Sequence, residues 1–309
     1  MKSMILIGEN IHIISALVKQ ACLDKNEEFF KNLISLQDNM EYIDLNVGPA
    51  KGDFSGILPW LTELVQKYAP QKGISFDTTN FDELVSGFNS YKSTKAFINS
   101  TSADKEKFEK VSDFALEKGC NLIALTLSKE TGIPKTSDGR LDLAFSMYER
   151  FLEKGFDTDK IFFDPLILPI SADQSQAIEA LNTIKMIKES FDPPVKTVIG
   201  LSNISNGCQR DLRGLINRVF AVLAFGAGLD AAIVDAKDLE LVRIIKMLEE
   251  NSPQSDTDRL YIRLAQMIEN FENLDDIDYN RDSKEEMNII KTVSVLLDNE
   301  VYSNCFTQT

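Results

Sequence analysis

Short apolar runs recur along this chain, and a polar or acidic residue closes nearly every one. The runs are 5–7, 42–45, 74–76, 96–98, 122–125, 161–163, 198–201 and 231–234. The residues that close them include Glu9, Asn46, Asp77, Asn99, Asp164, Ser202, Asn203 and Asp235. If the runs are eight parallel strands that close a barrel, these polar residues share one mouth, where such folds build active sites.

Helical patterns lie between the apolar runs. They cover 27–38, 54–68, 105–118, 141–154, 177–190 and 215–227. Apolar residues recur there at three- and four-residue steps, and Gly119, Gly155 and Gly228 follow three of these helices as stop signals. Strand alternating with helix indicates βαβ units and a parallel sheet. We therefore predict an α/β fold of the (β/α)8 TIM-barrel class, as a single domain over residues 1–309.

The composition and net charge of the chain indicate which kinds of partner it can bind. The chain has 309 residues, a net charge of −15 and 43% hydrophobic residues. The hydrophobic share is ample for a packed core. An acidic surface without a basic run repels phosphate backbones, so we expect no nucleic-acid partner.

Targeting and redox signals are weak. The first apolar run stops at Glu9, which is too short for a signal peptide, and no apolar stretch approaches membrane-spanning length. The cysteines lie far apart, at Cys22, Cys120, Cys208 and Cys305. This spacing favours reduced thiols in a cytoplasmic protein. With His12 as the single histidine, we predict no protein-bound metal of the Cys/His kind, and oxygen ligands stay open.

One stretch breaks the alternation of strand and helix. Residues 249–286 contain twelve acidic and four basic residues, so they carry −8 of the net charge. Helical spacing covers 259–271, with linker-like sequence on both sides. We predict an acidic helical insertion after the eighth strand that splits or extends the last barrel helix. It is either a solvated excursion or a surface for a partner.

A mouth rich in Asp and Asn, almost without His or Arg, suits a neutral, hydrogen-bonding heterocycle. The 2-amino-4-oxo edge of a pterin offers adjacent donors that carboxylates satisfy, and Asn amides suit the mixed positions. Each of these residues, taken singly, is also explained as a turn or helix cap. The prediction depends on several of them converging from different strands.

Longer motifs carry a resemblance to a known family. They are IDLNVGPAKG (43–52), SFDTTN (75–80), FINSTSADKEKFEK (97–110), LTLSKETGIPKTSDGRL (125–141), FFDPLILPI (162–170), KTVIGLSNISNGCQ (196–209), LINRVFAVLAFGAGLDAAIVDA (215–236) and VLLDNEVYSNCF (295–306). Together they resemble the methyltetrahydrofolate:corrinoid/iron-sulfur protein methyltransferases, which are pterin-binding barrels. The resemblance spans the chain except the acidic insertion. It implies an enzyme that moves the N5 methyl group between 5-methyltetrahydrofolate and the Co(I) centre of a cobalamin carried by a partner corrinoid protein.

The resemblance also implies roles for single residues. Asp77, Asn99 and Asp164 fall where the family holds the pterin ring, and Asn203 falls where an amide hydrogen-bonds near N5. We assign catalysis to Asn203 with a water network, because no side chain with a pKa near 7 is expected at the matching positions. The remaining pterin-site predictions are Ser202 and Asn46. Further mouth candidates are Glu9, His12, Gln209 and Asp235.

Three departures from the family pattern stand out. The family commonly opens with Gly-Glu-Arg-Ile-Asn, and this chain has Gly8-Glu9-Asn10-Ile11-His12, so His12 is either a wall residue or a titrating contact. Residues 210–214 add length and charge to the loop after Asn203, and Arg210 and Arg213 are either solvated or meet an anion. The acidic insertion leaves the corrinoid partner unidentified.

Three other functions compete with methyl transfer. A dihydropteroate synthase stabilises a leaving pyrophosphate with basic residues, and its Ser-Arg after the seventh strand is Ser202-Asn203 here. A non-catalytic pterin- or corrinoid-binding protein would use the same mouth. A metal-dependent barrel would want His/Asp/Glu ligand pairs, which the single histidine disfavours. Homodimerisation is implied only by the resemblance.

Overall fold

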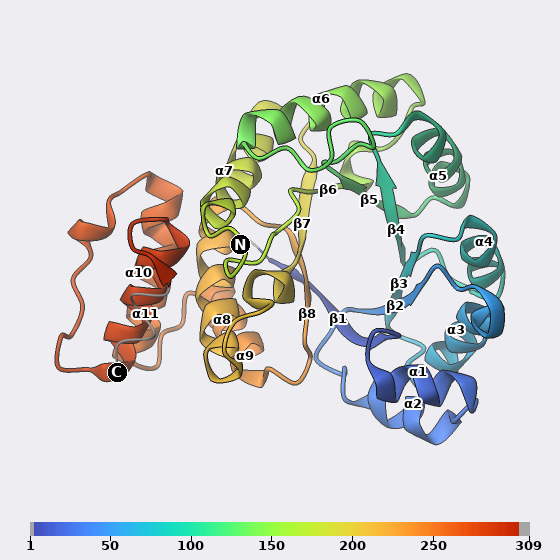
Figure 1. Cartoon of the computed structure of the whole chain (residues 1–309), viewed down its shortest axis with the longest axis horizontal. Coiled ribbons are helices and arrows are strands. Elements are labelled where there is room, and N and C mark those ends of the chain that lie inside the picture. Colours follow the sequence, from blue (N-terminus) through green and yellow to red (C-terminus); the bar gives the residue numbers. More distant parts are fainter. Residues whose placement is uncertain (1–2, 303–309) are drawn as a thin grey trace.

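The computed structural model describes residues 3–302, in which eight parallel strands close into a barrel in sequential order. The strands are β1 (Ile5–His12), β2 (Tyr42–Gly48), β3 (Gly73–Thr78), β4 (Ala96–Ser102), β5 (Asn121–Leu125), β6 (Ile161–Asp164), β7 (Lys196–Gly200) and β8 (Ala231–Val234). Each lies where an apolar run predicts it, and Figure 1 shows the helices ringing the barrel. The TIM-barrel prediction is confirmed. Cys305 and the end of motif 295–306 lie outside the described residues.

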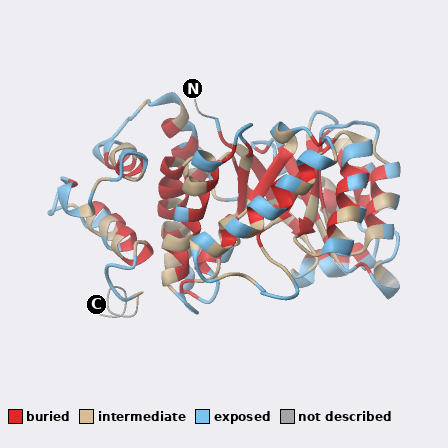
Figure 2. Ribbon diagram, turned by 90° about the horizontal axis from the view of Figure 1, so that it is seen from above, coloured by how far each residue is buried: buried red, intermediate tan, exposed pale blue. Residues whose placement is uncertain are grey.

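Eleven α-helices lie within the described residues. They are α1 (Ala16–Leu23), α2 (Glu27–Ser35), α3 (Ile57–Tyr68), α4 (Phe81–Asn89), α5 (Lys105–Lys118), α6 (Ser137–Glu153), α7 (Ser175–Ser190), α8 (Arg210–Ala227), α9 (Leu239–Glu250), α10 (Asp256–Asn270) and α11 (Lys284–Leu296). The prediction that 210–214 extend a loop is wrong, because these residues form the first turns of α8. Figure 2 shows the buried faces of the helices turned toward the sheet.

The lower half of the barrel interior is filled. Tyr42, Phe97 and Phe162 pack edge to face, with ring centroids 4.8 and 4.7 Å apart. Other buried side chains of the same layer are Ile7, Ile123, Val198 and Ala231. Gly73 makes room for this layer, since a Cβ there would lie 2.2 Å from the Tyr42 ring. Because aromatic packing closes the floor, a ligand reaches the barrel axis only from the mouth.

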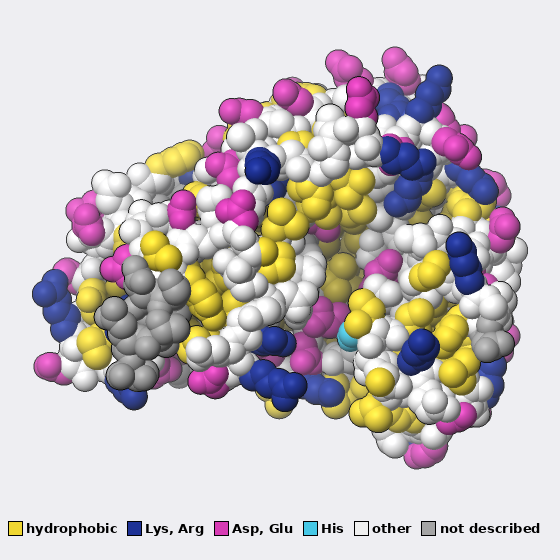
Figure 3. All heavy atoms as spheres, viewed as in Figure 1, with side chains coloured by type: hydrophobic (Ala, Val, Ile, Leu, Met, Phe, Trp, Pro, Cys, Tyr) yellow, Lys and Arg dark blue, Asp and Glu magenta, His cyan; other side chains and the backbone are white. Residues whose placement is uncertain are grey.

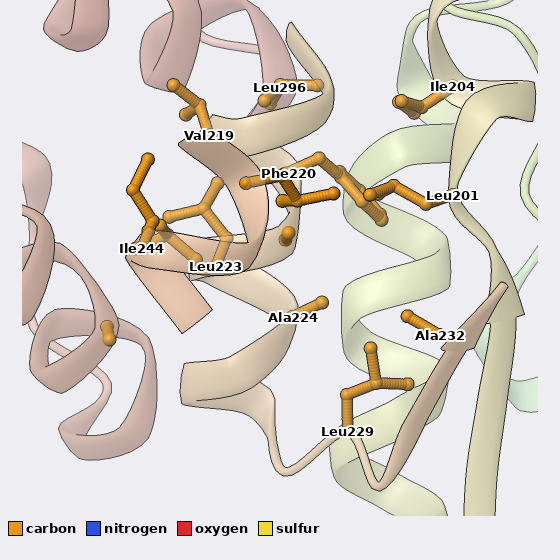
Figure 4. Close-up of a cluster of buried hydrophobic side chains, with 14 of the residues drawn as sticks. Leu201, Ile204, Val219, Phe220, Leu223, Ala224, Leu229, Ala232, Ile244 and Leu296 are labelled. Atoms are coloured by element: carbon orange, nitrogen blue, oxygen red, sulfur yellow. The ribbon is translucent and has the colours of Figure 1, made fainter. Parts of the chain in front are cut away.

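The acidic segment forms an outer layer. The last barrel helix, α9, runs unbroken to Glu250, so the insertion does not split it. Helix α10 packs on α8, and α11 packs on α7, α8 and α10 (Figure 1). Figure 4 shows Val219, Phe220 and Leu223 of α8 beside Leu296 of α11 and Ile244 of α9. The predicted helix 259–271 begins earlier, at Asp256, and ends at Asn270.

Gly226 permits the contact between α8 and α10. A Cβ at this position would lie 2.2 Å from the backbone oxygen of Ala265 in α10, a clash that only movement of the helix relieves. Asp258 of α10 is buried at 1% exposure and pairs with Arg243 of α9 at 2.7 Å. The outer layer is therefore held by the close approach of the α8 and α10 backbones at Gly226 and by the ion pair between Asp258 and Arg243.

We predict opposite effects for two glycine substitutions on α8. Gly226→Ala should lower the free energy of unfolding by about 1–3 kcal/mol, because it overpacks the α8–α10 contact. Gly214→Ala is the matched control: a Cβ there meets nothing closer than 3.8 Å, and helix propensity should raise stability by up to about 1 kcal/mol. Denaturant unfolding measures both, and equal shifts of one sign would contradict the assigned contact.

Candidate active site at the barrel mouth

A cavity of about 640 Å³ opens at the carboxyl ends of the strands. Most of the predicted residues line it: Glu9, His12, Asn46, Asp77, Asn99, Asp164, Ser202, Asn203 and Asp235. Gln209 does not line it, because it is the exposed residue preceding α8. Figure 3 shows acidic side chains inside this hollow and basic side chains on its rim. The convergence that the prediction requires is present.

Strands β2, β3 and β4 place three polar residues in one row. Asn46 pairs in register with Asp77, and Asp77 with Asn99. The Asn46 amide donates to Asp77 Oδ2 at 2.5 Å. Register shifts follow Asn46 in β2 and Asn99 in β4, and such irregularities redirect side chains at barrel rims. Burial raises the pKa of Asp77 to about 7, although the Asn46 hydrogen bond and the charge of Lys107 oppose it.

Asp164 stands at the end of β6. Its carboxylate accepts the backbone N–H of Leu166 at 2.8 Å, and its carbonyl accepts the Thr126 N–H and hydroxyl. Burial raises the pKa of Asp164 to about 7, against that backbone hydrogen bond and the charge of Arg140. The second oxygen of this carboxylate accepts no hydrogen bond from the described residues, so it is available to a donor in the cavity.

Asp44 is a cavity residue that the sequence did not single out. It lies on β2 below the row, is 3% exposed, and accepts the Ser75 hydroxyl at 2.5 Å. Burial, helped by the charge of Asp77, raises the pKa of Asp44 well above its usual range. A lone Asp inside an apolar strand was the available signal, because an uncompensated buried carboxylate is costly.

Two residues of strand β1 form hydrogen bonds to the residues that follow β7 and β8, on the other side of the mouth. Glu9 accepts the Ser202 hydroxyl at 2.5 Å, and Asn10 donates to Asp235 at 2.5 Å. The side-chain amide oxygen of Asn10, Oδ1, also accepts the Ala236 N–H. Burial raises the pKa of Glu9 to about 7; its hydrogen bond to Ser202 opposes this and the nearby Asp235 charge adds to it. Asn10, where the family has Arg, thus links β1 to β8.

His12 lies on the wall of the cavity, half-buried. Burial lowers the pKa of its imidazole. The negative charge of Asp235 raises this pKa, but the effect of burial is larger. The ring is therefore neutral near pH 7, which favours the wall-residue interpretation over a titrating contact.

A short 3-10 turn, Leu201–Ser205, presents Asn203 at the rim. A Cβ on Gly200 would lie 2.9 Å from the Asn203 amide nitrogen, so glycine there gives the amide its position. Nearby, Asn217 of α8 has a buried side-chain oxygen without a hydrogen-bond partner among the described residues. Asn217 was missed because its sequence context reads as an ordinary amphipathic helix.

The positive charge of Arg140 acts on Asp164. It is fully buried on α6, donates to Pro134 O at 3.0 Å and to Gln176 Oε1 at 2.6 Å, and its Nη1 has no partner in the described part of the chain. Its charge favours the ionised form of Asp164. Between residues 3 and 302, no cluster of three or more His, Cys, Asp or Glu has a metal-binding arrangement. No helix in that range is long and apolar enough to span a bilayer.

Comparisons with known proteins agree with this geometry. The family described as pterin binding enzyme matches residues 44–235. The chain belongs to the pterin-binding enzymes. Methylcorrinoid:tetrahydrofolate methyltransferase of Eubacterium limosum is 26% identical over 246 residues, covering 78% of this chain and 89% of that protein. Methionine synthase of Mycobacterium leprae is 29% identical over 200 residues, which cover 62% of this chain and 16% of that longer protein.

Solved structures of pterin-binding enzymes share the fold. Dihydropteroate synthase of Yersinia pestis aligns with a TM-score of 0.56 at 14% identity, over 80% of this chain and 94% of that one. At this identity the likeness shows the barrel alone. The sequence relatives confirm the resemblance to methyltransferases that the motifs indicate.

The raised carboxyl pKa values predict an unusual pH dependence of stability. The folded chain holds the protons of Asp77, Asp164 and Glu9 up to about pH 7, whereas the unfolded chain releases them near pH 4. Stability should therefore fall as pH rises from 4 to 7 and then level off.

We expect Asp164→Asn to flatten this fall and to raise the free energy of unfolding at pH 8 by about 2 kcal/mol. Asn keeps the oxygen that accepts the Leu166 N–H. Asp142→Asn, at an exposed position on α6, is the control for removing one carboxylate. Thermal unfolding from pH 5 to pH 8 measures both, and parallel profiles for wild type and Asp164→Asn would refute the shifted pKa.

Proposed function

We propose that this pterin-binding enzyme moves the N5 methyl group between 5-methyltetrahydrofolate and the cobalt of a corrinoid carried by a partner protein. The observation that carries the proposal is the two-sided mouth. Asp44, Asp77 and Asp164 lie on the β2–β6 side, and a rim amide, Asn203, stands on the β7 side, with Glu9 and Asp235 next to it on β1 and after β8. The named methylcorrinoid:tetrahydrofolate methyltransferase relative supports the same reaction.

The carboxylate side recognises the pterin edge. The exocyclic amine and ring N–H are donors, and Asp164 offers an oxygen that accepts no hydrogen bond from residues 3–302. Asp77 and Asn99 are neighbours in register on β3 and β4, so a flat ring can contact both. Asn46 orients Asp77 through its hydrogen bond. Because a donor edge favours ionised carboxylates, ligand binding offsets the cost of burying them.

The amide side serves the reacting nitrogen. N5 is a poor leaving group until it is protonated, and Asn203 supplies a dipole that stabilises the charge developing there. The expectation that no group near the site titrates around pH 7 is wrong, because burial brings three carboxyls to that range. Ser202, which precedes Asn203, donates to Glu9. We infer that the proton reaches N5 through ordered water that Asn203 holds by hydrogen bonding. The protonated carboxyl group of Glu9 is the proposed source of that proton.

The corrinoid supplies, when its protein docks, the strongly nucleophilic cobalt that accepts the methyl group. This chain's task is to hold the pterin with the methyl group facing outward. Ile14 lines the mouth at 85% exposure, an apolar contact for a docking partner. We further propose a homodimer, on the resemblance alone, and a cytoplasmic location, on the spacing of the cysteines.

A dihydropteroate synthase activity lacks its electrostatic partner. Asn203 stands where that enzyme carries Arg, and six carboxylates line the cavity against one arginine, Arg213; the carboxylates are Glu9, Asp44, Asp77, Asp164, Asp235 and Asp238. A leaving pyrophosphate would be repelled there. A binding-only barrel would bind methyltetrahydrofolate without consuming reduced cobalamin, which the next experiment detects.

We predict that two substitutions separate binding from transfer. Asn203→Ala should lower the rate of methyl transfer to free Co(I) cobalamin about 100-fold with little change in folate affinity, because its amide acts mainly in the transition state. Asp164→Ala should weaken folate binding about 10- to 100-fold. Stopped-flow absorbance of Co(I) and calorimetric binding measure the two effects, and equal losses in both would refute these roles. Intact folate binding without any Co(I) consumption would leave only the binding-protein function.

A further inference from the structure

A separate cavity of about 230 Å³ lies beside the ends of β3 and β4. It shares no lining residue with the main cavity. Thr78 and Ser100 line it, and each directly follows a residue that lines the main cavity, Asp77 or Asn99. Because successive side chains of a strand point to opposite faces, this cavity lies across the strand ends from the proposed pterin site.

Three lysines line this second cavity, which we call the lysine cavity. Lys107 and Lys110 come from α5, and Lys129 follows β5. None of their ammonium groups forms an ion pair or a hydrogen bond with a residue between 3 and 302. Nζ of Lys110 lies 4.2 Å from the ring centroid of Phe81, which also lines the cavity. Among the described lining residues, the exposed Glu106 carries the only carboxylate.

Other acidic residues of this region have partners elsewhere. Glu109 and Asp113 of α5 bind Lys154 of α6, each at 2.5 Å. Asp104, which precedes α5, accepts the backbone N–H of Lys129 at 2.7 Å. In a chain with a net charge of −15, three unpaired cations at one cavity are an exception, and their combined field attracts an anion.

The charge of Lys107 is costly in the empty cavity. Its side chain is half-buried, and burial lowers the pKa of its ammonium. The charges of Asp104 and Asp77 oppose this shift, and the like charge of Lys129 adds to it. An anion between the two ammonium groups would replace their repulsion with attraction and restore part of the lost solvation.

We propose that the lysine cavity binds a phosphate-type oxyanion, held by its three ammonium groups and by the hydroxyls of Thr79 and Ser100. Ammonium and hydroxyl groups are donors, and a phosphate offers several acceptor oxygens. The anion is either a free ion or the phosphate group of a small ester. A neighbouring hollow of about 450 Å³ shares Thr79 and Lys110 with the lysine cavity and adds Lys51, so it has room for the remainder of an ester.

Lys107 links this anion site to Asp77 in the main cavity. Burial raises the pKa of Asp77 to about 7, and the charge of Lys107 opposes that rise. An anion beside Lys107 offsets its charge, so fewer Asp77 side chains are ionised at neutral pH and a pterin donor edge binds more weakly. A bound pterin then weakens anion binding by the same factor. This linkage rests on the proposed function, whereas the anion site itself does not.

Calorimetry with inorganic phosphate tests the site directly, in chloride buffers of matched ionic strength. Wild-type protein should bind one phosphate per chain with a dissociation constant on the order of 1 mM. Lys110→Ala and Lys129→Ala should each weaken this binding about 3- to 10-fold, because each removes a charged donor. Lys92→Ala is the matched control and should change nothing: Lys92 is exposed and precedes β4, at the opposite end of the barrel.

Glycerol phosphate distinguishes the two sources of the anion. Affinity equal to that of inorganic phosphate assigns the site to the free ion. Tighter binding of glycerol phosphate, lost in Lys51→Ala, assigns it to an ester that extends into the neighbouring hollow. Thermal unfolding verifies that each variant is folded.

A second measurement tests the linkage with a tailless 5-methyltetrahydropterin, which carries no anionic group that could itself enter the lysine cavity. Its dissociation constant at pH 7 should rise about 3- to 10-fold when saturating phosphate replaces chloride. Lys107→Met should weaken pterin binding in chloride and remove the response to phosphate. Lys107→Arg keeps the charge and should preserve both.

The outcomes separate the anion site from the proposed function. No phosphate binding to wild-type protein, or equal losses in Lys110→Ala, Lys129→Ala and Lys92→Ala, would overturn the anion site and leave the pterin site intact. Phosphate binding without any effect on pterin affinity would overturn the linkage through Lys107. Failure of the pterin to bind in chloride would overturn the proposed function, while phosphate binding that depends on Lys110 and Lys129 would still establish the anion site.

Discussion

Closure of the parallel barrel is the constraint on which the site depends. Eight strands place their carboxyl ends in one ring, and the aromatic layer of Tyr42, Phe97 and Phe162 fills the interior below it. Strand β1 completes the ring through its pairing with both β2 and β8. The contacts of Glu9 and Asn10 with the β7 and β8 ends extend that closure to the rim. Residues far apart in sequence therefore meet in one cavity without any loop having to bring them together.

The cavity concentrates carboxylates that the fold does not need. Asp44, Asp77 and Asp164 have raised pKa values because burial disfavours their charged forms, and only partial hydrogen bonding compensates. Such groups reduce the stability of the ligand-free protein near neutral pH. A donor-rich ligand would remove that cost when it binds, so the proposed affinity for a pterin edge and the instability of the empty mouth have one physical origin.

The sequence predicts the barrel and most of the mouth, since strand-end position is a local property that apolar runs reveal. Asp77, Asn99 and Asp164 were found in this way. Other features depend on tertiary contacts. Asp44 and Arg140 are buried polar residues whose partners come from other elements. Asp44 is marked locally only as a lone Asp in an apolar run, and nothing local marks Arg140. The shifted pKa values likewise follow from burial depth, which strand-end spacing does not encode. Helix α8 starts at Arg210, where the sequence predicted a loop, and α1 and α11 were not predicted.

The acidic segment lies away from the mouth, on the outer side of the barrel. In the proposed function the β2–β6 half recognises the pterin ring, and the β7–β8–β1 half holds Asn203 and Glu9. No residue of 249–286, all of them described, lines the main cavity; instead, α10 packs on the outer face of α8. Helix α8 begins near the mouth, after the turn that carries Asn203, and packs against α10, so the segment supports the helix that follows this turn. Its acidic residues, including the buried Asp258 and Glu286, lie outside the cavity lining. Additional negative charge inside the cavity would raise the pKa values of its carboxyl groups further.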